Sequence, residues 1–524
     1  MKIGIDFDNT LVDYGDAFRL IAVEMGIVSS DFAGGRDTLR DHLQTNSNQE
    51  QWWQLQAEVY GRQIMEAEPF PGCVKAIETL VGDAHSVSIV SHKTERSYAG
   101  NYDLRDAAIK WLEKAGIAAL IDDSNIYFLS SLEQKLEKLR ELKTDIFLDD
   151  LPVVLQHEAF PKSSKGILFD PNTSVGAWDG FVIRNWTDLP ACVDALAGQN
   201  SSAAPFAHAR RLHPITGGIN SHVYKLDTDN GAFALKIYPQ PEPDHPDRMD
   251  CEINALNFLQ NEQPDLAPNV ISANGGKRSV LLQWLEGKTP QQMNTTRLDA
   301  VISFVAKLKM WGTEVRYDEF GPAREACFAP CQIADQIQSR ASRLKSSAAG
   351  LDDFFQNEFD PVAQPVLRDC QHLALYDLEI DPQFQVLSPS DFGLHNTIEN
   401  GAGELSFIDF EYFGWDDPAK LVADFTWHPS MSLTPAHTQK FIGEAATIFK
   451  NDPEFHDRLR LVYPLYGLRW ALIVLNCFID ENWSRQRATE NQNRDQVKVT
   501  QLQIAVKFVE RVRTLLDGLP DDVS

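Results

Sequence analysis

"KIGIDFDNTL", residues 2–11, places two aspartates, Asp6 and Asp8, directly after a short run of mostly apolar residues. Ile and Phe favour strands, whereas Asp and Asn are poor strand residues, so the acids are expected where a strand ends. Open α/β sheets bind their ligands at the carboxyl ends of the strands. The stretch therefore predicts a sheet with a ligand site at its edge.

Strand-like and helix-like segments alternate up to about residue 190, which predicts a doubly wound parallel sheet in an α/β domain. The strand candidates are residues 2–6, 85–91, 125–129, 145–150, 166–170 and 181–186, and helical patterns cover 102–116 and 131–143. A polar and aromatic insertion with helical patterning, about residues 13–70, follows the first strand. We expect it to form a small helical cap over the sheet edge.

A change of pattern in the middle of the chain indicates two different domains. The segment "AGQNSSAAP", residues 197–205, is small, polar and without periodicity, as in a linker. We predict a first domain over 1–196, a linker over 197–207 and a second domain over 208–524. Within the second domain, residues 208–290 resemble hairpin strands with one helix, and 291–524 are mainly helical.

Composition excludes several classes of partner. The formal charge of −27 and the pI near 4.8 argue against nucleic acid and against an anionic membrane surface. Seven scattered cysteines suit a reducing cytosol better than a disulfide framework, and Cys327 with Cys331 lacks a second zinc-ligand pair. We expect a cytoplasmic protein, and a buried helix in the apolar stretch that begins at Leu461.

The first domain carries residue types that suit phosphoryl transfer to a carboxylate. Asp6 and Asp8 are two apart and face the same side of an extended segment. One carboxylate can attack phosphorus, and the other can protonate the leaving oxygen and then activate water. Mg²⁺ must reduce the repulsion between an anionic nucleophile and an anionic substrate. Asp149 and Asp150 end another strand, and Ser91 ends a third.

These residues resemble the haloacid dehalogenase-like phosphohydrolases over about residues 1–195. The resemblance implies Asp6 as nucleophile, Asp8 as general acid and base and Ser91 as phosphate ligand. It also implies a magnesium site made by Asp6, Asp8, Asp149 and Asp150. The family lysine is predicted to be Lys135, with Lys93, Lys138 and Lys143 as alternatives.

The second domain opens with the elements of a nucleotide site. Backbone amides at Gly217 and Gly218, in the turn of a predicted hairpin, could cradle phosphates. Lys236 lies in or just beyond the second strand, and sixteen residues later Glu252 lies in a helical pattern that could hold this lysine against the phosphates. The segment 280–287 is expected to be a strand that runs into an interlobe connector.

Asp391, Asn396 and Asp409 have the order that kinase chemistry needs, a base followed by two magnesium ligands. Together with the hairpin they resemble the aminoglycoside phosphotransferase and choline kinase family over about residues 208–524, which implies a bilobal kinase-like fold. By that resemblance Asp391 is the catalytic base, Asn396 and Asp409 bind Mg²⁺, and ATP is the cofactor. Further implied residues are Ser221, Lys236, Glu252, Gln283 and Leu285 at the nucleotide, with Glu411 and Asp417 in support.

One position departs from this family. Pro389 stands where the family usually has a histidine, two residues before the catalytic aspartate. That histidine generally shapes the loop, so the departure leaves the chemistry in place. His395, inside the loop, is interpreted as a packing or hydrogen-bonding residue.

The leading hypothesis is a bifunctional enzyme that combines a Mg²⁺-dependent phosphatase with an ATP-dependent small-molecule kinase. Its partners are then a phosphorylated small molecule, for example a sugar or polyol phosphate, an alcohol acceptor and a nucleoside triphosphate. One alternative makes one domain a silent sensor or scaffold, and a lesser one is an antibiotic-modifying kinase. Trp52 and Trp53 could line a substrate pocket or anchor the cap.

Overall fold

The computed structural model describes residues 1–15, 17–32, 34–45, 48–176, 178–197, 209–215, 221–243, 245–480 and 494–517. Gly217, Gly218 and nearly all of the predicted linker lie outside these ranges. The chain divides into two compact units, of which the first includes residues 1–216 and 222–237 and the second most of the remainder. The strands that follow the predicted linker, residues 209–215 and 222–237, thus group with the first unit.

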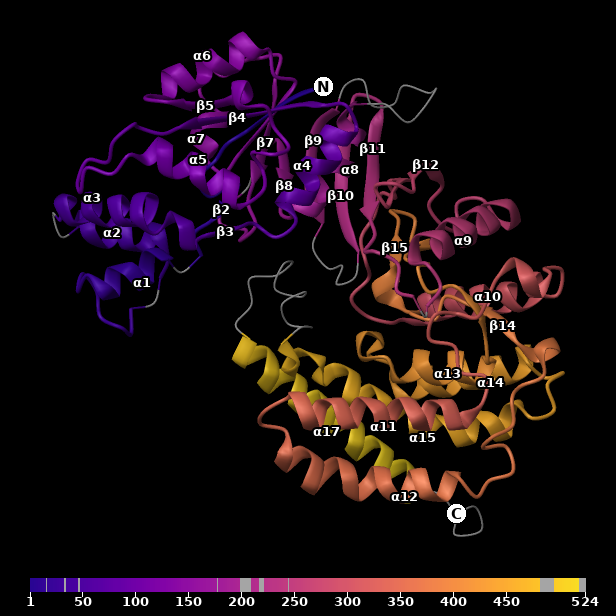
Figure 1. The fold of residues 1–524 in the computed structure, drawn as a ribbon. Coiled ribbons are helices and arrows are strands. Elements are labelled where there is room, and N and C mark those ends of the chain that lie inside the picture. The colour runs from indigo at the N-terminus through magenta and orange to yellow at the C-terminus, as the bar shows by residue number, and fades with distance from the viewer. Residues whose placement is uncertain are drawn as a thin grey trace. The chain divides into compact units, whose positions relative to one another are not determined.

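The first unit is built on one large sheet (Figure 1). Within it the strand order is β11-β10-β9-β8-β7-β6-β1-β4-β5. The strands are β1 Lys2–Ile5, β4 Ser86–His92, β5 Ile126–Leu129, β6 Ile146–Asp149, β7 Lys165–Phe169, β8 Phe181–Ile183, β9 Ala209–Ile215, β10 His222–Thr228 and β11 Gly231–Ile237. The neighbouring strands β8, β7, β6, β1, β4 and β5 pair in parallel, as the alternating pattern predicts. Strands β9, β10 and β11 form an antiparallel meander.

Helices connect the parallel strands of this unit, because parallel neighbours need crossover connections. They are α4 Cys73–Gly82, α5 Leu104–Lys114, α6 Leu132–Leu142, α7 Pro152–Leu155 and α8 Leu189–Ala197. Leu136 and Leu139 of α6 pack against Val90 and Phe147 in one fully buried cluster. The predicted strand over 181–186 is wrong at its end: Trp186 begins a short 3₁₀ turn, and its indole Nε1 donates to the Thr10 carbonyl at 2.9 Å.

The insertion after β1 is helical and is closed at its base by two short strands. β2 Val12–Asp13 pairs antiparallel with β3 Glu68–Pro69. Between them lie α1 Ala17–Glu24, α2 Arg36–Thr45 and α3 Gln49–Ala57. Trp52 is buried and stacks on Phe18 with ring centroids 5.7 Å apart, so this tryptophan belongs to the core of the insertion.

The second unit is mainly helical, with three small antiparallel hairpins or pairs. The strand pairs are β12 Val270–Asn274 with β13 Ser279–Gln283, β14 Val386–Ser388 with β17 Gly414–Asp416, and β15 Thr397–Glu399 with β16 Leu405–Phe407. The helices are α9 Arg248–Glu262, α10 Thr295–Gly312, α11 Pro330–Ser347, α12 Asp360–Cys370, α13 Pro418–Trp427, α14 Pro435–Ile448, α15 Phe455–Ile473 and α17 Arg494–Asp517. Together with the first unit this makes a mixed α/β protein.

The apolar stretch from Leu461 forms part of α15, which contacts α11, α12, α13 and α17 (Figure 1). Residues 455–478 are long and apolar enough to cross a membrane by composition, but 67% of the most apolar window is buried inside the protein. The expectation of a buried helix is therefore confirmed. All seven cysteines are free thiols.

Candidate active sites

The acids of the first unit meet because their strands are neighbours. β1 and β6 are parallel, with Ile5 opposite Leu148, and the Asp6 amide donates to the Leu148 carbonyl at 2.9 Å. Asp6 follows β1, and Asp149 ends β6, so both reach the same sheet edge. Carboxylate oxygens of Asp6, Asp149 and Asp150 all lie within 4.8 Å of one another. The predicted convergence of these three acids is present.

Lys135 is the lysine that the structure places between these acids. Its Nζ lies 2.6 Å from Asp6 Oδ1 and 2.6 Å from Asp149 Oδ2, and the residue is 2% exposed. Burial alone would lower the pKa of Lys135, but the two carboxylates raise it above its usual range. The alternatives lie elsewhere: Lys138 pairs with Glu141, and Lys143 forms the left-handed C-cap of α6.

A second buried lysine, Lys93, holds the other aspartate of the motif. Its Nζ donates to both oxygens of Asp8, at 2.8 and 2.7 Å, and the Tyr14 hydroxyl donates to Asp8 Oδ1 at 2.5 Å. Burial and the nearby Asp8 raise the pKa of Tyr14 well above its usual range. These contacts fix the Asp8 carboxylate, and its predicted role at the metal stays a prediction. No sequence signal pointed to Tyr14.

The acid cluster fits a divalent cation. Burial and the negative charges of Asp6 and Asp149 raise the pKa of Asp150 well above its usual range. The pKa of Asp149 is raised to about 6, chiefly by burial. Asp150 Oδ1 is buried and accepts no hydrogen bond from any residue that the structure describes. Hard oxygen ligands of this kind are those that Mg²⁺ prefers. Asp6, Asp149 and Asp150 are thus the residues that could hold the ion.

A pocket of about 360 Å³ opens above these acids within the first unit. Its lining includes Asp6, Asp8, Ser91, Lys93, Lys135 and Asp150 from the sheet side, and Arg36, Trp53, Gln56 and Tyr60 from the insertion. Trp53 stacks on Tyr98 with centroids 5.8 Å apart and remains 40% exposed. The two tryptophans thus divide the two predicted roles: Trp53 lines the pocket, and Trp52 anchors the insertion.

The acids of the second unit are arranged by one hairpin. Asp391 lies just beyond β14, and the Asn396 amide Nδ2 donates to the Asp391 carbonyl at 3.0 Å. Asn396 precedes β15 and Asp409 follows β16, and the Ile408 amide donates to the Asn396 carbonyl at 3.0 Å. The hairpin thus brings the two predicted magnesium ligands to the same end, beside the loop of Asp391.

Two stacked histidines contact the predicted catalytic base. His395 Nε2 lies 3.1 Å and His428 Nε2 3.6 Å from Asp391 Oδ1, and the two rings are parallel with centroids 4.3 Å apart. Burial opposes ionisation of Asp391, but the His395 hydrogen bond and the two histidines lower its pKa to about 2. Burial lowers the pKa of His428 to about 3. His395 is thus a hydrogen-bonding residue, as interpreted, whereas His428 was not predicted.

A second acidic group surrounds Asp409. Ligand atoms of Glu252, Asp409 and Glu411 lie within 4.8 Å of one another. Glu252 accepts a hydrogen bond from the Tyr238 hydroxyl at 2.7 Å, and Glu411 accepts one from Ser221 Oγ at 2.6 Å. Arg248, which no motif indicated, also donates to Glu411 at 2.5 Å. Carboxylate oxygens that could bind a metal ion therefore lie around the predicted ligand Asp409.

The remaining nucleotide candidates are placed but not joined into one site. Lys236 is buried in β11 of the first unit, whereas Glu252 is buried on α9 of the second, so their ion pair stays a prediction. Gln283 ends β13, and its backbone N–H donates to the backbone carbonyl of Asn269 at 2.9 Å. Leu285 is half-buried just beyond that strand.

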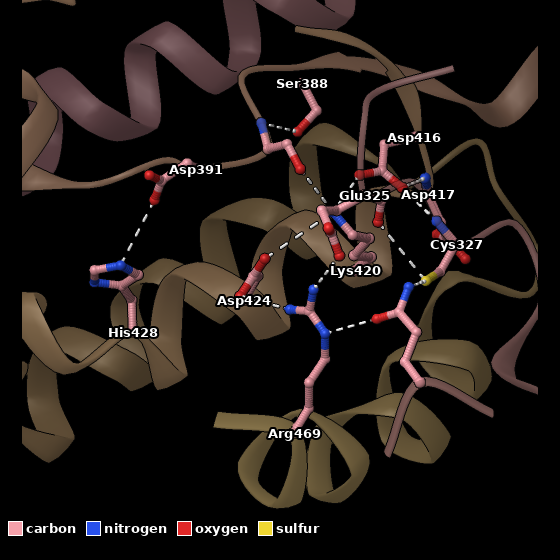
Figure 2. A network of polar contacts seen from close by, with 12 residues as sticks. Glu325, Cys327, Ser388, Asp391, Asp416, Asp417, Lys420, Asp424, His428 and Arg469 are labelled. Atoms are coloured by element: carbon pink, nitrogen blue, oxygen red, sulfur yellow. Dashed lines mark hydrogen bonds and ion pairs between the residues drawn. The ribbon is translucent and has the colours of Figure 1, made fainter. Parts of the chain in front are cut away.

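A buried network of charged residues lies behind the Asp391 loop (Figure 2). Lys420 Nζ contacts Asp416 Oδ2 at 2.5 Å and Ser390 Oγ at 3.2 Å. Arg469 donates to Glu325 at 2.9 Å, and its Nη1 lies 3.8 Å from Asp424. Arg469 lies within the apolar stretch that begins at Leu461. An unexplained charge in such a stretch was the available signal, because buried charges require partners.

Known proteins match both parts of the chain. Residues 211–454, slightly less than half of the chain, match the model of the phosphotransferase enzyme family. The match supports a kinase-like phosphotransferase activity for that segment. A Bacillus cereus protein described as "Putative nucleotidase" is 24% identical over 162 residues, which are 30% of this chain and 79% of that protein. This is a weak, distant likeness to a phosphohydrolase.

Several solved structures are similar at low sequence identity. They include an ethanolamine kinase from Plasmodium vivax (14% identity, 61% of this chain and 86% of that one, TM-score 0.39) and the choline kinase LicA from Streptococcus pneumoniae (18%, 57% and 93%, 0.39). A spectinomycin phosphotransferase in complex with ADP and spectinomycin is another (11%, 62% and 98%, 0.44).

Proposed function

We propose that this chain is a bifunctional enzyme, with a Mg²⁺-dependent phosphomonoesterase in residues 1–196 and an ATP-dependent small-molecule kinase in residues 208–524. The convergence of Asp6, Lys135, Asp149 and Asp150 in one pocket supports the first activity. The family match of residues 211–454 supports the second. The first domain is then a Rossmann-like haloacid dehalogenase-type phosphatase in the cytoplasm.

In the phosphatase reaction, an Asp6 carboxylate oxygen attacks phosphorus and the bond to the leaving alcohol breaks. Asp8, held by Tyr14 and Lys93, delivers a proton to that alcohol and then takes one from the water that cleaves the aspartyl-phosphate. Lys135 reduces the repulsion between the nucleophile and the phosphoryl group. Bound Mg²⁺ would supply further neutralisation of charge at Asp6, Asp149 and Asp150.

In the kinase reaction, the carboxylate of Asp391 orients the acceptor hydroxyl and receives its proton. The bond from that oxygen to the γ-phosphorus forms while the bond between the γ-phosphorus and the β,γ-bridging oxygen breaks, and ADP leaves. Its low pKa keeps it ionised at neutral pH. Asn396 and Asp409 would hold the cation that ATP brings. Asp391 is thus ready to act as soon as nucleotide and acceptor are bound.

Two opposite activities on one chain require different regiospecificity. If both domains acted on the same oxygen, the net result would be hydrolysis of ATP. We therefore propose that the kinase adds phosphate at one hydroxyl of a sugar or polyol phosphate and the phosphatase removes phosphate from another. The nucleotidase-like relative extends the candidate phosphatase substrates to nucleoside monophosphates.

A screen with labelled ATP tests this proposal. The Asp6→Asn variant is incubated with ATP carrying a γ-³²P label, Mg²⁺ and a panel of sugars, polyols, amino alcohols, their phosphates and aminoglycosides. We expect a labelled small molecule that the Asp6→Asn/Asp391→Asn double variant does not form. Absence of any labelled product across the panel, with nucleotide still bound, would instead favour a silent kinase domain. Labelling confined to aminoglycosides would favour the antibiotic-modifying kinase.

A further inference from the structure

The loop that carries Asp391 contains a strained residue next to the catalytic position. Ser390 has φ of 65°, in the left-handed region that non-glycine residues rarely adopt. Such a conformation is strained and persists only when surrounding contacts hold it. Within the loop, the Ser390 amide donates to Ser388 Oγ at 3.0 Å, and the Asp391 amide donates to the Pro389 carbonyl at 2.9 Å. Pro389 itself has no side-chain donor.

Lys420 contacts the strained residue, Ser390, from outside the loop. This lysine lies on α13, its side chain is 1% exposed, and its Nζ donates to Ser390 Oγ at 3.2 Å. The same ammonium contacts Asp416, the last residue of β17, and β17 pairs with β14, the strand that leads into the loop. One buried cation therefore joins the strained residue to the strand pair that supports it.

The same helix also reaches Asp391 from its other end. His428 forms the C-cap of α13, and its Nε2 lies 3.6 Å from Asp391 Oδ1. The ring of Trp470 meets the His428 ring edge-on with centroids 4.5 Å apart, and its Nε1 donates to Asp424 at 2.7 Å. Helix α13 thus fixes the loop at Ser390 and at Asp391.

We infer that Lys420 is a positioning residue for the catalytic aspartate. It holds Ser390 in its strained conformation and so sets the direction of the Asp391 carboxylate, without contacting nucleotide or acceptor. This inference rests on the proposed kinase function of the second domain.

The test needs variants that keep the fold. Lys420→Met alone leaves Asp416 buried without its cation, which can unfold the domain. The double variant Lys420→Met/Asp416→Asn replaces the ion pair by neutral groups, and Lys420→Arg keeps the charge. Arg458→Met is the matched control, because Arg458 is an equally buried cation that pairs with Asp417 and Asp452 and is not bonded to Ser390 or Asp391.

Each variant is made in the Asp6→Asn background, and the probe is MgATP with water as the acceptor. Turnover and the dissociation constant of MgADP are measured on folded protein. A 1 Å displacement of a reacting group can cost about 10²-fold. We therefore expect kcat to fall roughly 10- to 100-fold in the neutral double variant, with the MgADP constant within about twofold. Lys420→Arg should recover part of kcat, and Arg458→Met should lower thermal stability while keeping kcat.

Unchanged kcat in the neutral double variant, with turnover still abolished by Asp391→Asn, would overturn the positioning role alone. An equal loss of kcat in Arg458→Met would also overturn it, because buried charge in general would then account for the effect. If Asp391→Asn itself keeps full turnover, the proposed kinase function fails, and the positioning role fails with it.

Discussion

The two candidate sites use buried lysines in different ways. At the first site Lys135 and Lys93 touch the carboxylates of Asp6 and Asp8 directly. At the second site the Asp391 carboxylate contacts two histidines, and the buried lysine, Lys420, lies behind the loop. Three acids face each other at the first site and need cations between them. At the second site, Glu252, Asp409 and Glu411 form a group of their own, and Asp391 needs a fixed direction more than a neutralising partner.

The difference shows how similar residue types serve different demands. An anionic nucleophile that receives a phosphoryl group must sit in a positive field, so its lysines line the pocket. A base that receives a proton from an alcohol needs a free lone pair aimed at that alcohol, so its supporting lysine stays out of contact. The following changes test this comparison, beginning with the largest expected effect.

Removing the proposed nucleophile, Asp6, should separate the two sites completely. Asp6→Asn leaves no carboxylate to accept phosphorus, so hydrolysis of p-nitrophenyl phosphate should fall by at least about 10³-fold. Asp391→Asn should leave this hydrolysis unchanged. Equal loss in both variants would contradict two independent sites.

Removing the lysine from the first site should cost more than removing its surface neighbour. Lys135→Met withdraws the cation that lies 2.6 Å from both Asp6 and Asp149, and phosphatase kcat should fall roughly 10²- to 10³-fold. Lys138→Met, on the same helix but paired only with Glu141 near the surface, is the control and should stay near the wild-type rate. A comparable loss in both would point to the helix rather than to the ammonium group.

Magnesium should suppress the pH dependence of stability that the acids of the first site cause. The pKa of Asp149 is raised to about 6, above the value of about 3.9 in an unfolded chain, so without metal the folded state binds this proton more tightly. That contribution is present below pH ~4 and is lost as the pH rises through about 6. In EDTA the melting temperature should therefore fall with rising pH relative to Asp149→Asn, and Mg²⁺ should suppress the fall. A pH profile identical in EDTA and in Mg²⁺ would argue against a cation at this cluster.

A smaller effect, on the free energy of unfolding, is expected from the contacts between β10 and Asp188 in the first unit. The Tyr224 hydroxyl donates to the buried Asp188 at 2.6 Å, and His222 Nδ1 lies 2.8 Å from the same carboxylate. Tyr224→Phe should lower the free energy of unfolding by roughly 1.5–3 kcal/mol, because a buried hydrogen bond to a charged group is lost. Tyr98→Phe, at a 78% exposed side chain, is the control and should change it little. Urea unfolding measures both, and equal midpoints would show that the Asp188 contact is not stabilising.

The sequence predicted best where local pattern and chemistry agree. Alternation of apolar residues located β1 and β6, and acids at their ends identified the Asp6 cluster, because adjacent parallel strands end at one edge. The order of Asp391, Asn396 and Asp409 likewise predicted one site, and the hairpin of β15 and β16 places Asn396 and Asp409 at the same end.

Long-range contacts could not be predicted from the same patterns. Tyr14, His428 and Lys420 reach their partners through tertiary packing, and no spacing rule links Lys420 to Ser390, thirty residues earlier in the chain. The grouping of β9, β10 and β11 with the first unit also depends on the pairing of β8 with β9, beyond the predicted linker. A pattern of residues shows which face of an element is buried, but not which distant element covers it.

The most direct test follows phosphorus through both sites by ³¹P NMR. Wild type, Asp6→Asn and Asp391→Asn are each given ATP, Mg²⁺ and the phosphorylated acceptor that the labelling screen identifies. We predict that Asp6→Asn accumulates a molecule with two phosphoryl groups, and that Asp391→Asn releases inorganic phosphate without consuming ATP. The wild-type enzyme should convert the molecule with two phosphoryl groups into a product that is phosphorylated only at the new position. Return of unchanged acceptor by the wild-type enzyme, with steady loss of ATP, would contradict the account.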